Sequence, residues 1–155
     1  MSFAALLTEG QVVVDFAAKD KPQAVAGLVD VLTALGRLTP VQRAAAVDAL
    51  LAREKIGSTG LEHGIALPHA IVDIPGEALA VLAVSRDGVP FQAADGGPSR
   101  LLVLLLVPRR AVQKHLRTLA GVARLLDRAD VREALLKART AKEALEIVRA
   151  GETAG

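Results

Sequence analysis

The stretch KIGSTGLEHGIALPH, residues 55–69, says more about the fold than any other part of this sequence. Its three glycines allow tight backbone bends and close approach to a bound group. Ser58 and Thr59 add hydroxyls and backbone N–H groups between two of these glycines. Residues 65–67 are apolar and predict a short buried strand. Because the next residue is a proline, which fixes the backbone, we expect His69 at a defined strand end, where an imidazole can be reactive.

The composition fits one cytoplasmic domain. A chain of 155 residues that is 52% hydrophobic can bury a single sizeable core. No segment approaches the ~20 apolar residues of a membrane-spanning helix, and the first residues make a poor signal peptide. We therefore expect no direct membrane insertion. Cysteine is absent, which excludes disulfides, thiolate metal sites and catalytic thiols.

The charge distribution is uneven. The net charge of +2 is too small to indicate a nucleic-acid partner, and the absence of Trp and Tyr argues against base stacking. Residues 108–128, however, carry six cations against one acid. Two interpretations of this basic segment stay open: a solvated helix face, or a surface that docks a partner or attracts phosphate.

The hydrophobic pattern predicts an α/β domain with a mixed sheet and helices on both faces, because strands and helices alternate irregularly along the chain. Residues 101–107 form an unbroken apolar strand that we expect at the centre of the sheet. Asp20 and Thr39 are predicted helix caps. The tail from Ala150 is expected to fray. The other predicted strands are residues 12–14, 65–67 and 79–85. The predicted helices cover residues 20–35, 39–54 and 112–127, and two further helices are predicted to begin near residues 130 and 140.

Three histidines are available for chemistry. His69 follows the glycine loop, and His115 lies in the first turn of the helix after strand 101–107. Because each follows the end of a strand, we expect the two imidazoles to converge at one edge of the sheet. His63 lies within the glycine loop and is expected to be a surface residue. Arg53, at the end of helix 39–54, either complements the negative helix end or binds phosphate beside the loop.

Other kinds of site fit less well. The glycine loop lacks the G-x-x-x-x-G-K-[ST] pattern of nucleotide-binding P-loops. The chain has no G-x-S-x-G nucleophile elbow and no H-E-x-x-H zinc motif. Three histidines without cysteine do not assign a metal site, so we expect neither a metal nor a cofactor. Without an ATP site, a phosphoryl group would have to come from an external donor.

Residues 53–69 resemble the active-site segment of enzyme IIA domains of the bacterial phosphotransferase system, of the fructose, mannitol and nitrogen-regulatory type. The pattern of that family is roughly R-E-x-x-G-S-T-G-x-x-x-G-I-A-[IL]-P-H. A second histidine of the family, in an H-L-x-x-L context after a Val-Pro step, matches His115. The resemblance covers residues 6–148 and implies one domain, residues 1–155, with a five-stranded mixed sheet flanked by helices.

The resemblance also implies a function. His69 would be the phosphorylated nucleophile, and the phosphoryl group would come from an HPr-like carrier charged by phosphoenolpyruvate. It would pass to a IIB domain in sugar transport, or act as a signal to a regulatory target in nitrogen regulation. The sequence leans weakly toward the nitrogen-regulatory branch. Phosphate stabilisation would fall to His115, and phosphate binding to Arg53, Ser58, Thr59 and Gly60.

Two hypotheses of different class remain. The first is a phosphotransferase component that carries a phosphoryl group on His69. The second is a non-catalytic regulatory interaction module with the same fold. The presence of His69, His115 and Arg53 together favours the first. Arg109 and Arg110 lie outside the family pattern, and we expect them to tune the choice of partner.

Overall fold

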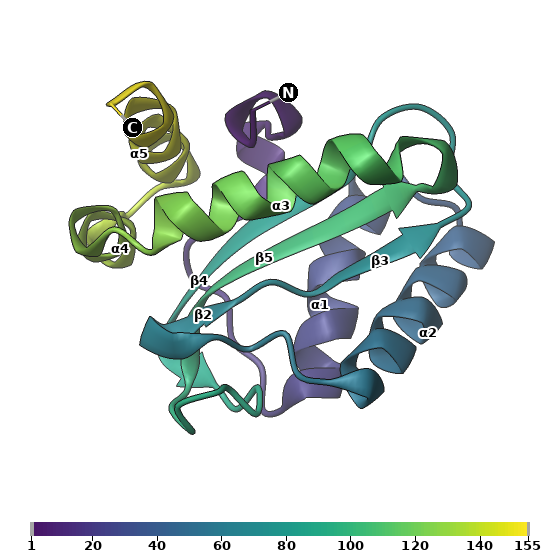
Figure 1. Ribbon diagram of the computed structural model, residues 1–155, viewed down its shortest axis with the longest axis horizontal. Helices are drawn as coiled ribbons and strands as arrows, with labels where there is room; N and C mark the ends of the chain where they lie inside the picture. Colours follow the sequence, from purple (N-terminus) through teal and green to yellow (C-terminus); the bar gives the residue numbers. More distant parts are fainter. Residues whose placement is uncertain (1, 155) are drawn as a thin grey trace.

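A mixed five-stranded sheet organises the chain (Figure 1), which we describe over residues 2–154 of a computed structural model. The strand order is β1-β4-β5-β2, and β3 also pairs with β5. The central pair β4–β5 is antiparallel and the other pairs are parallel. This confirms the predicted fold class. The strands are β1 Val12–Val13, β2 Ile65–Ala66, β3 His69–Val72, β4 Leu79–Val89 and β5 Ser99–Pro108.

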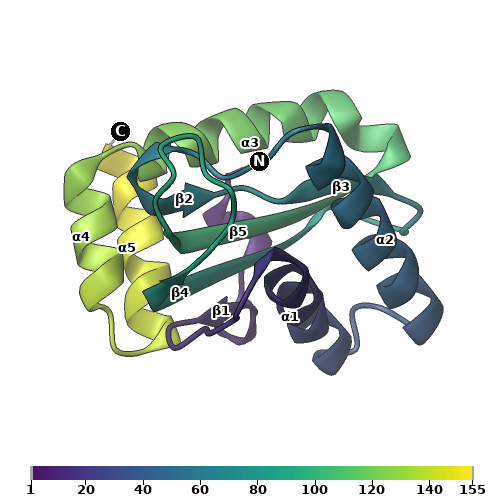
Figure 2. The same ribbon diagram turned by 90° about the horizontal axis from the view of Figure 1, so that it is seen from below.

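Helices cover both faces of the sheet (Figure 2). Helices α1 and α2 pack on one face, and α3, α4 and α5 on the other. No helix in the described part of the chain is long and apolar enough to cross a membrane. The helices are α1 Lys21–Ala34, α2 Pro40–Ile56, α3 Val112–Leu126, α4 Ala129–Lys137 and α5 Ala141–Ala154, with short 3-10 turns η1 Ala4–Leu6, η2 Glu9–Gln11, η3 Glu62–Gly64 and η4 Arg109–Ala111.

Strand β5 is central and buried on both faces, as its apolar run predicts. Successive side chains of a strand point to opposite faces. Leu101, Val103 and Leu105 therefore join the core beneath α3–α5, whereas Leu102 and Leu104 join the core beneath α1 and α2. A strand that serves two cores needs apolar residues at every position, which explains the unbroken pattern.

Some predicted boundaries are confirmed. The Asp20 carboxylate accepts a hydrogen bond from the backbone N–H of Gln23 (2.9 Å) and caps α1. Thr39 and Gln42 form a reciprocal capping box at the start of α2. Both caps satisfy backbone donors that the first turn of a helix leaves unpaired, so the local sequence suffices to place these helix starts.

Other predictions at element ends are wrong. α5 runs to Ala154 and does not fray from Ala150, because the Glu152 carboxylate accepts hydrogen bonds from the backbone N–H groups of Phe3 and Ala4 (both 2.9 Å). α4 begins at Ala129, near the predicted residue 130, and its start has no side-chain cap. β4 continues past residue 85 through an irregularity in its pairing with β5.

Candidate functional site

The backbone around His69 is an interrupted edge strand. β2 and β3 pair with β5 in one continuous register, and the interruption falls at Leu67 and Pro68. Pro68 has no N–H to donate, and the N–H of Leu67 donates to the carbonyl of Thr59 (3.1 Å). The carbonyl of Leu67 lies 2.7 Å from His69 Nδ1. His69 therefore begins β3, and does not end a strand as predicted.

This contact decides which nitrogen of His69 can react. A carbonyl oxygen only accepts hydrogen bonds, so the Nδ1 atom 2.7 Å from the Leu67 carbonyl must carry the proton. In the neutral imidazole, Nε2 then holds the free electron pair. The break in the strand thus presents His69 as a nucleophile with a fixed tautomer.

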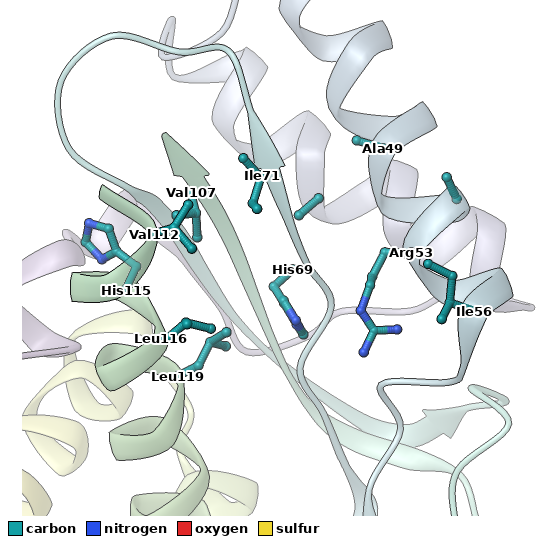
Figure 3. Close-up of a pocket in the computed structure, with 12 residues that line it drawn as sticks. Ala49, Arg53, Ile56, His69, Ile71, Val107, Val112, His115, Leu116 and Leu119 are labelled. Atoms are coloured by element: carbon teal, nitrogen blue, oxygen red, sulfur yellow. The ribbon is translucent and has the colours of Figure 1, made fainter. Parts of the chain in front are cut away.

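His69 lies in a mostly apolar cleft of about 480 Å³ between α2, the edge strand β3 and α3 (Figure 3). Three apolar side chains on its walls are exposed to solvent: Ile56 (84%), Leu116 (53%) and Ile71 (46%). Exposed apolar side chains around one cleft are a feature of protein interaction sites. The cleft is lined by Ala49, Ala52, Arg53, Ile56, His69, Ala70, Ile71, Val107, Val112, His115, Leu116 and Leu119.

Arg53 lies beside His69, on the last turn of α2 (Figure 3). Its Nη1 donates a hydrogen bond to the carbonyl of Gly57 (2.8 Å), which holds the guanidinium at the end of the helix. Arginine has five N–H donors. The remaining donors of Arg53 are therefore available to an anion attached to His69.

His115 lines the same cleft but its ring is turned toward the β3–β4 loop. The residue is fully buried. Its Nε2 has no hydrogen-bond partner among residues 2–154 and lies 3.6 Å from the Glu77 carboxylate. Nδ1 lies 3.4 Å from the Thr118 hydroxyl. Burial lowers the pKa of His115, against the opposing effect of Glu77. The two imidazoles line one cleft, as predicted, but in Figure 3 they do not point toward each other.

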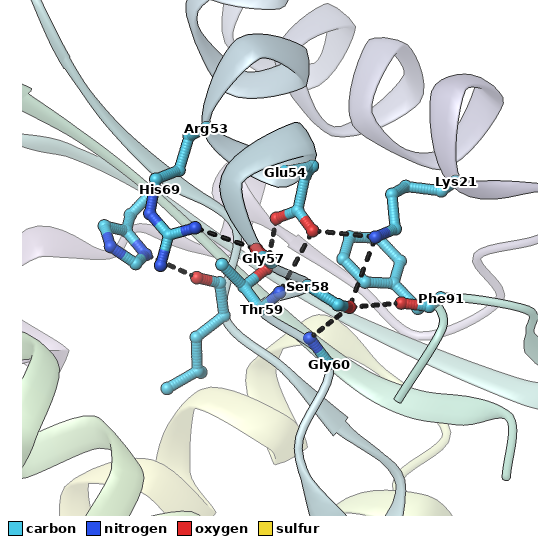
Figure 4. A network of polar contacts seen from close by, with 10 residues as sticks. Lys21, Arg53, Glu54, Gly57, Ser58, Thr59, Gly60, His69 and Phe91 are labelled. Atoms are coloured by element: carbon cyan, nitrogen blue, oxygen red, sulfur yellow. Dashed lines mark hydrogen bonds and ion pairs between the residues drawn. The ribbon is translucent and has the colours of Figure 1, made fainter. Parts of the chain in front are cut away.

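Glu54, the residue after Arg53, is the centre of a buried polar network (Figure 4). The Glu54 carboxylate is 2.9 Å from Lys21 Nζ, and both side chains are nearly inaccessible to solvent. Glu54 also accepts hydrogen bonds from the backbone N–H of Thr59 (3.0 Å) and from the Thr59 hydroxyl. A carboxylate buried in this way needs such a set of partners, because an unpaired buried charge is costly.

Ser58 continues the network into the glycine loop. Its hydroxyl donates to the carbonyl of Phe91 (2.6 Å) and accepts from Lys21 Nζ (3.2 Å) and from the N–H of Gly60 (3.1 Å). Gly60 is packed so closely that a Cβ there would lie 3.0 Å from the Phe91 carbonyl oxygen. Lys21 Nζ also lies 4.8 Å from the centroid of the Phe91 ring. These contacts fix the loop against α1 and the segment after β4.

The structure divides the predicted site residues into two groups. Arg53, His69 and His115 line one cleft, whereas Ser58, Thr59 and Gly60 do not. The hydroxyls of Ser58 and Thr59 and the N–H of Gly60 are already engaged in the network. The Thr59 hydroxyl donates to the buried Glu54 carboxylate, whereas the Ser58 hydroxyl donates to the Phe91 carbonyl and accepts from the N–H of Gly60.

Lys21 and Glu54 were not predicted as site residues. The position of Glu54, directly after Arg53 at a helix end, was a usable signal. Lys21 gave none, because it precedes the loop by more than 30 residues.

His63 is exposed, as predicted, and its backbone N–H donates to the Asp95 carboxylate (3.3 Å). Its φ of 65° is unusual for a residue other than glycine, although histidine is among the side chains that tolerate it. Over residues 2–154, no three His, Asp or Glu side chains gather closely enough to hold a metal ion.

Comparison with known proteins agrees with this geometry. Residues 5–151 match the family described as Phosphoenolpyruvate-dependent sugar phosphotransferase system, EIIA 2. A fructose-specific EIIA component of Haloferax volcanii is 37% identical over 83% of this chain and 82% of its own length. A nitrogen regulatory protein of Pseudomonas aeruginosa is 44% identical over 64% of each chain. The crystal structure of the nitrogen regulatory protein IIA-Ntr from Neisseria meningitidis superposes with a TM-score of 0.84 at 31% identity, over 94% of this chain and 97% of that one. The chain therefore belongs to the EIIA 2 family of the phosphoenolpyruvate-dependent phosphotransferase system.

Proposed function

We propose that this protein carries a phosphoryl group on Nε2 of His69, accepts it from an HPr-like carrier protein, and either passes it to a IIB domain or uses it as a nitrogen-regulatory signal. The observation that carries this proposal is the 2.7 Å contact between His69 Nδ1 and the Leu67 carbonyl, in a cleft that opens to solvent. It leaves one nucleophilic nitrogen with a fixed orientation.

The proposed step exchanges one nitrogen–phosphorus bond for another. The Nε2 electron pair of His69 attacks the phosphorus, the bond from phosphorus to the donor imidazole breaks, and its electron pair returns to the donor nitrogen. The proton on Nδ1 of His69 stays in place, and the Leu67 carbonyl stabilises the positive charge that develops on the ring. Such a reaction depends on alignment and on stabilisation of the phosphoryl oxygens more than on proton transfer.

Arg53 and His115 are the proposed phosphate-binding side chains. Arg53 supplies a permanent positive charge beside His69. His115, with its pKa lowered by burial, supplies a neutral N–H donor. To reach a phosphoryl group on His69, its ring would turn away from Glu77. Ser58, Thr59 and Gly60 contribute by keeping the loop rigid, through the network around Glu54.

The cleft favours a protein donor over a small one. Its rim is formed by the exposed side chains of Ile56, Ile71 and Leu116. Apolar centres of this kind are typical of protein–protein contacts. Both branches of the family remain candidates for the acceptor, since the relatives include a fructose-specific EIIA component and a nitrogen regulatory protein.

Intact-mass analysis tests the proposal. The protein and its His69→Ala variant are incubated with phosphoenolpyruvate, enzyme I and an HPr-like carrier. We expect one acid-labile phosphate on the wild type and none on the variant. If an active donor leaves the wild type unmodified, the alternative of a non-catalytic interaction module takes first place. Equal labelling of the variant would show that His69 is not the acceptor.

A further inference from the structure

The charged side chains of helix α3 and of the turn that precedes it are all positive. Between Arg109 and Leu126 there are five cationic side chains and no Asp or Glu. A solvated helix face usually mixes both signs. The five residues are Arg109, Arg110, Lys114, Arg117 and Arg124.

Four of these charges, those of Arg109, Arg110, Arg117 and Arg124, have no ion-pair partner among residues 2–154. Lys114 forms an ion pair with Glu77 (3.1 Å), and Arg110 donates to the carbonyl of Gly76 (3.3 Å). Arg109, Arg117 and Arg124 are exposed and form no ion pair with residues 2–154. Arg109 and Arg117 therefore direct their positive charge at the solvent, whereas Arg124 shares a hollow with the acidic residues Glu62 and Asp127.

Arg117 and Arg124 belong to the helix whose apolar residues line the cleft of His69, although neither side chain lines that cleft itself. Val112, Leu116 and Leu119 line the cleft, and Ala123 continues the row into a neighbouring hollow that Arg124 also lines. These apolar residues follow helical spacing and share one face of α3. Arg117 and Arg124 each come one position after a member of this row, so they point about 100° away from it around the helix axis, toward the outer surface of α3. Figure 1 shows α3 extending along the whole sheet.

From this arrangement we infer that α3 selects the partner by charge: the protein that exchanges a phosphoryl group with His69 carries an acidic patch beside its own reacting group. The inference rests on the proposed function and names the chemistry of its partner. The apolar row would meet the centre of the partner, and Arg117 and Arg124 would meet the acidic patch. Complementary charges of this kind mainly raise the association rate and exclude wrong partners.

The geometry of α3 favours a protein over an anionic membrane. A helix that lies on a bilayer needs an apolar face directed outward. The apolar residues of α3 face the core or the cleft, and its outward positions include Gln113, Lys114, Arg117 and Arg124.

The test is the rate of phosphoryl uptake from the HPr-like carrier of the same organism, measured as kcat/KM at several salt concentrations. The double variant Arg117→Glu/Arg124→Glu is compared with Arg139→Glu/Arg149→Glu, which changes the net charge equally at exposed sites outside the cleft. Phosphoramidate serves as a second phosphoryl donor. It has no docking face, so it reports on His69 alone.

We expect the α3 variant to lose about tenfold or more in kcat/KM with the carrier at low salt, and its salt dependence to flatten. The control variant should keep the wild-type rate and salt dependence, and all three proteins should react equally with phosphoramidate. Equal effects of the two double variants, or no effect of either, would overturn the inference. So would α3-dependent binding to phosphatidylserine vesicles with unchanged carrier kinetics. A wild type that accepts no phosphoryl group from either donor would instead refute the proposed function.

Discussion

Arg53 and Glu54 are neighbours in the sequence, but they serve two regions that differ in almost every physical respect. Arg53 opens onto the cleft of His69, which is accessible and mostly apolar. Glu54 faces a buried network in which Lys21, Ser58 and Thr59 pair with one another or with the carboxylate. Consecutive helix residues point about 100° apart, so a single helix end can supply both regions.

The difference separates residues that are expected to stabilise the fold, in the network, from residues that are expected to take part in chemistry, in the cleft. In the network, the polar groups of Lys21, Glu54 and Ser58 have partners, which is what a buried position requires. In the cleft, apolar surface stays exposed and the guanidinium of Arg53 keeps free donors. The cleft therefore keeps apolar surface and Arg53 donors exposed, whereas the polar groups of the network are paired within the protein.

The largest contrast is expected in stability. Replacing Glu54 with Ala leaves Lys21 as an uncompensated buried charge and should lower the free energy of unfolding by about 3–5 kcal/mol. Replacing Arg53 with Ala removes a partly exposed side chain and should cost about 1 kcal/mol or less. Urea unfolding of both variants measures the difference. Equal losses would show that the two regions are not energetically distinct.

The contrast should reverse for phosphoryl transfer. Arg53→Ala removes a positive charge beside His69 and is expected to slow transfer about 100-fold, the usual effect of losing one donor to a developing anion. Single-turnover transfer from the phosphorylated carrier measures this rate. Arg53→Lys keeps the charge without the planar fork and should recover part of it. A wild-type rate in Arg53→Ala would remove this residue from the site.

The apolar residues of the cleft are expected to affect docking and to leave stability nearly unchanged. Leu116→Ala should change the free energy of unfolding by no more than about 0.5 kcal/mol, because the side chain is half exposed. The same change at the buried Leu104 should cost about 2–5 kcal/mol. In transfer assays, Leu116→Ala should raise KM for the carrier several-fold. An unchanged KM would place the docking surface elsewhere.

The smallest expected effect is a pH dependence of stability that originates at His115. Burial depresses its pKa in the folded protein below the ordinary value of 6.5, so the unfolded chain binds the proton more readily. Stability from this residue is therefore complete above about pH 6.5 and is lost as the pH falls below that value. Denaturation midpoints between pH 5 and 8 should flatten in His115→Gln. If the slope is the same in both proteins, His115 does not cause it.

Glu77 offers a second check of the same residue. Its carboxylate raises the pKa of His115 and so opposes the effect of burial. Glu77→Gln should lower the pKa of His115 further, which NMR titration of the ring would detect. A rise in that pKa would contradict the contact seen at 3.6 Å.

The amino-acid sequence by itself determined the fold class and most of the elements, and it singled out His69 as the candidate nucleophile. The apolar run of β5 required a strand buried on both faces, and the caps at Asp20 and Thr39 placed two helix starts. The pattern from Arg53 to His69 identified the loop and its histidine. These features depend on short-range chemistry, which neighbouring residues carry.

The tertiary structure decided what each polar group contacts. It turned the Thr59 hydroxyl toward Glu54 and the Ser58 hydroxyl toward the Phe91 carbonyl. It also placed His115 beside Glu77 and joined Lys21 to a loop distant in the sequence. It also kept α5 helical to its end through Glu152. Buried charges and donors must find partners wherever the folded chain brings them. Such partners lie far apart in sequence, so local patterns carry no record of them.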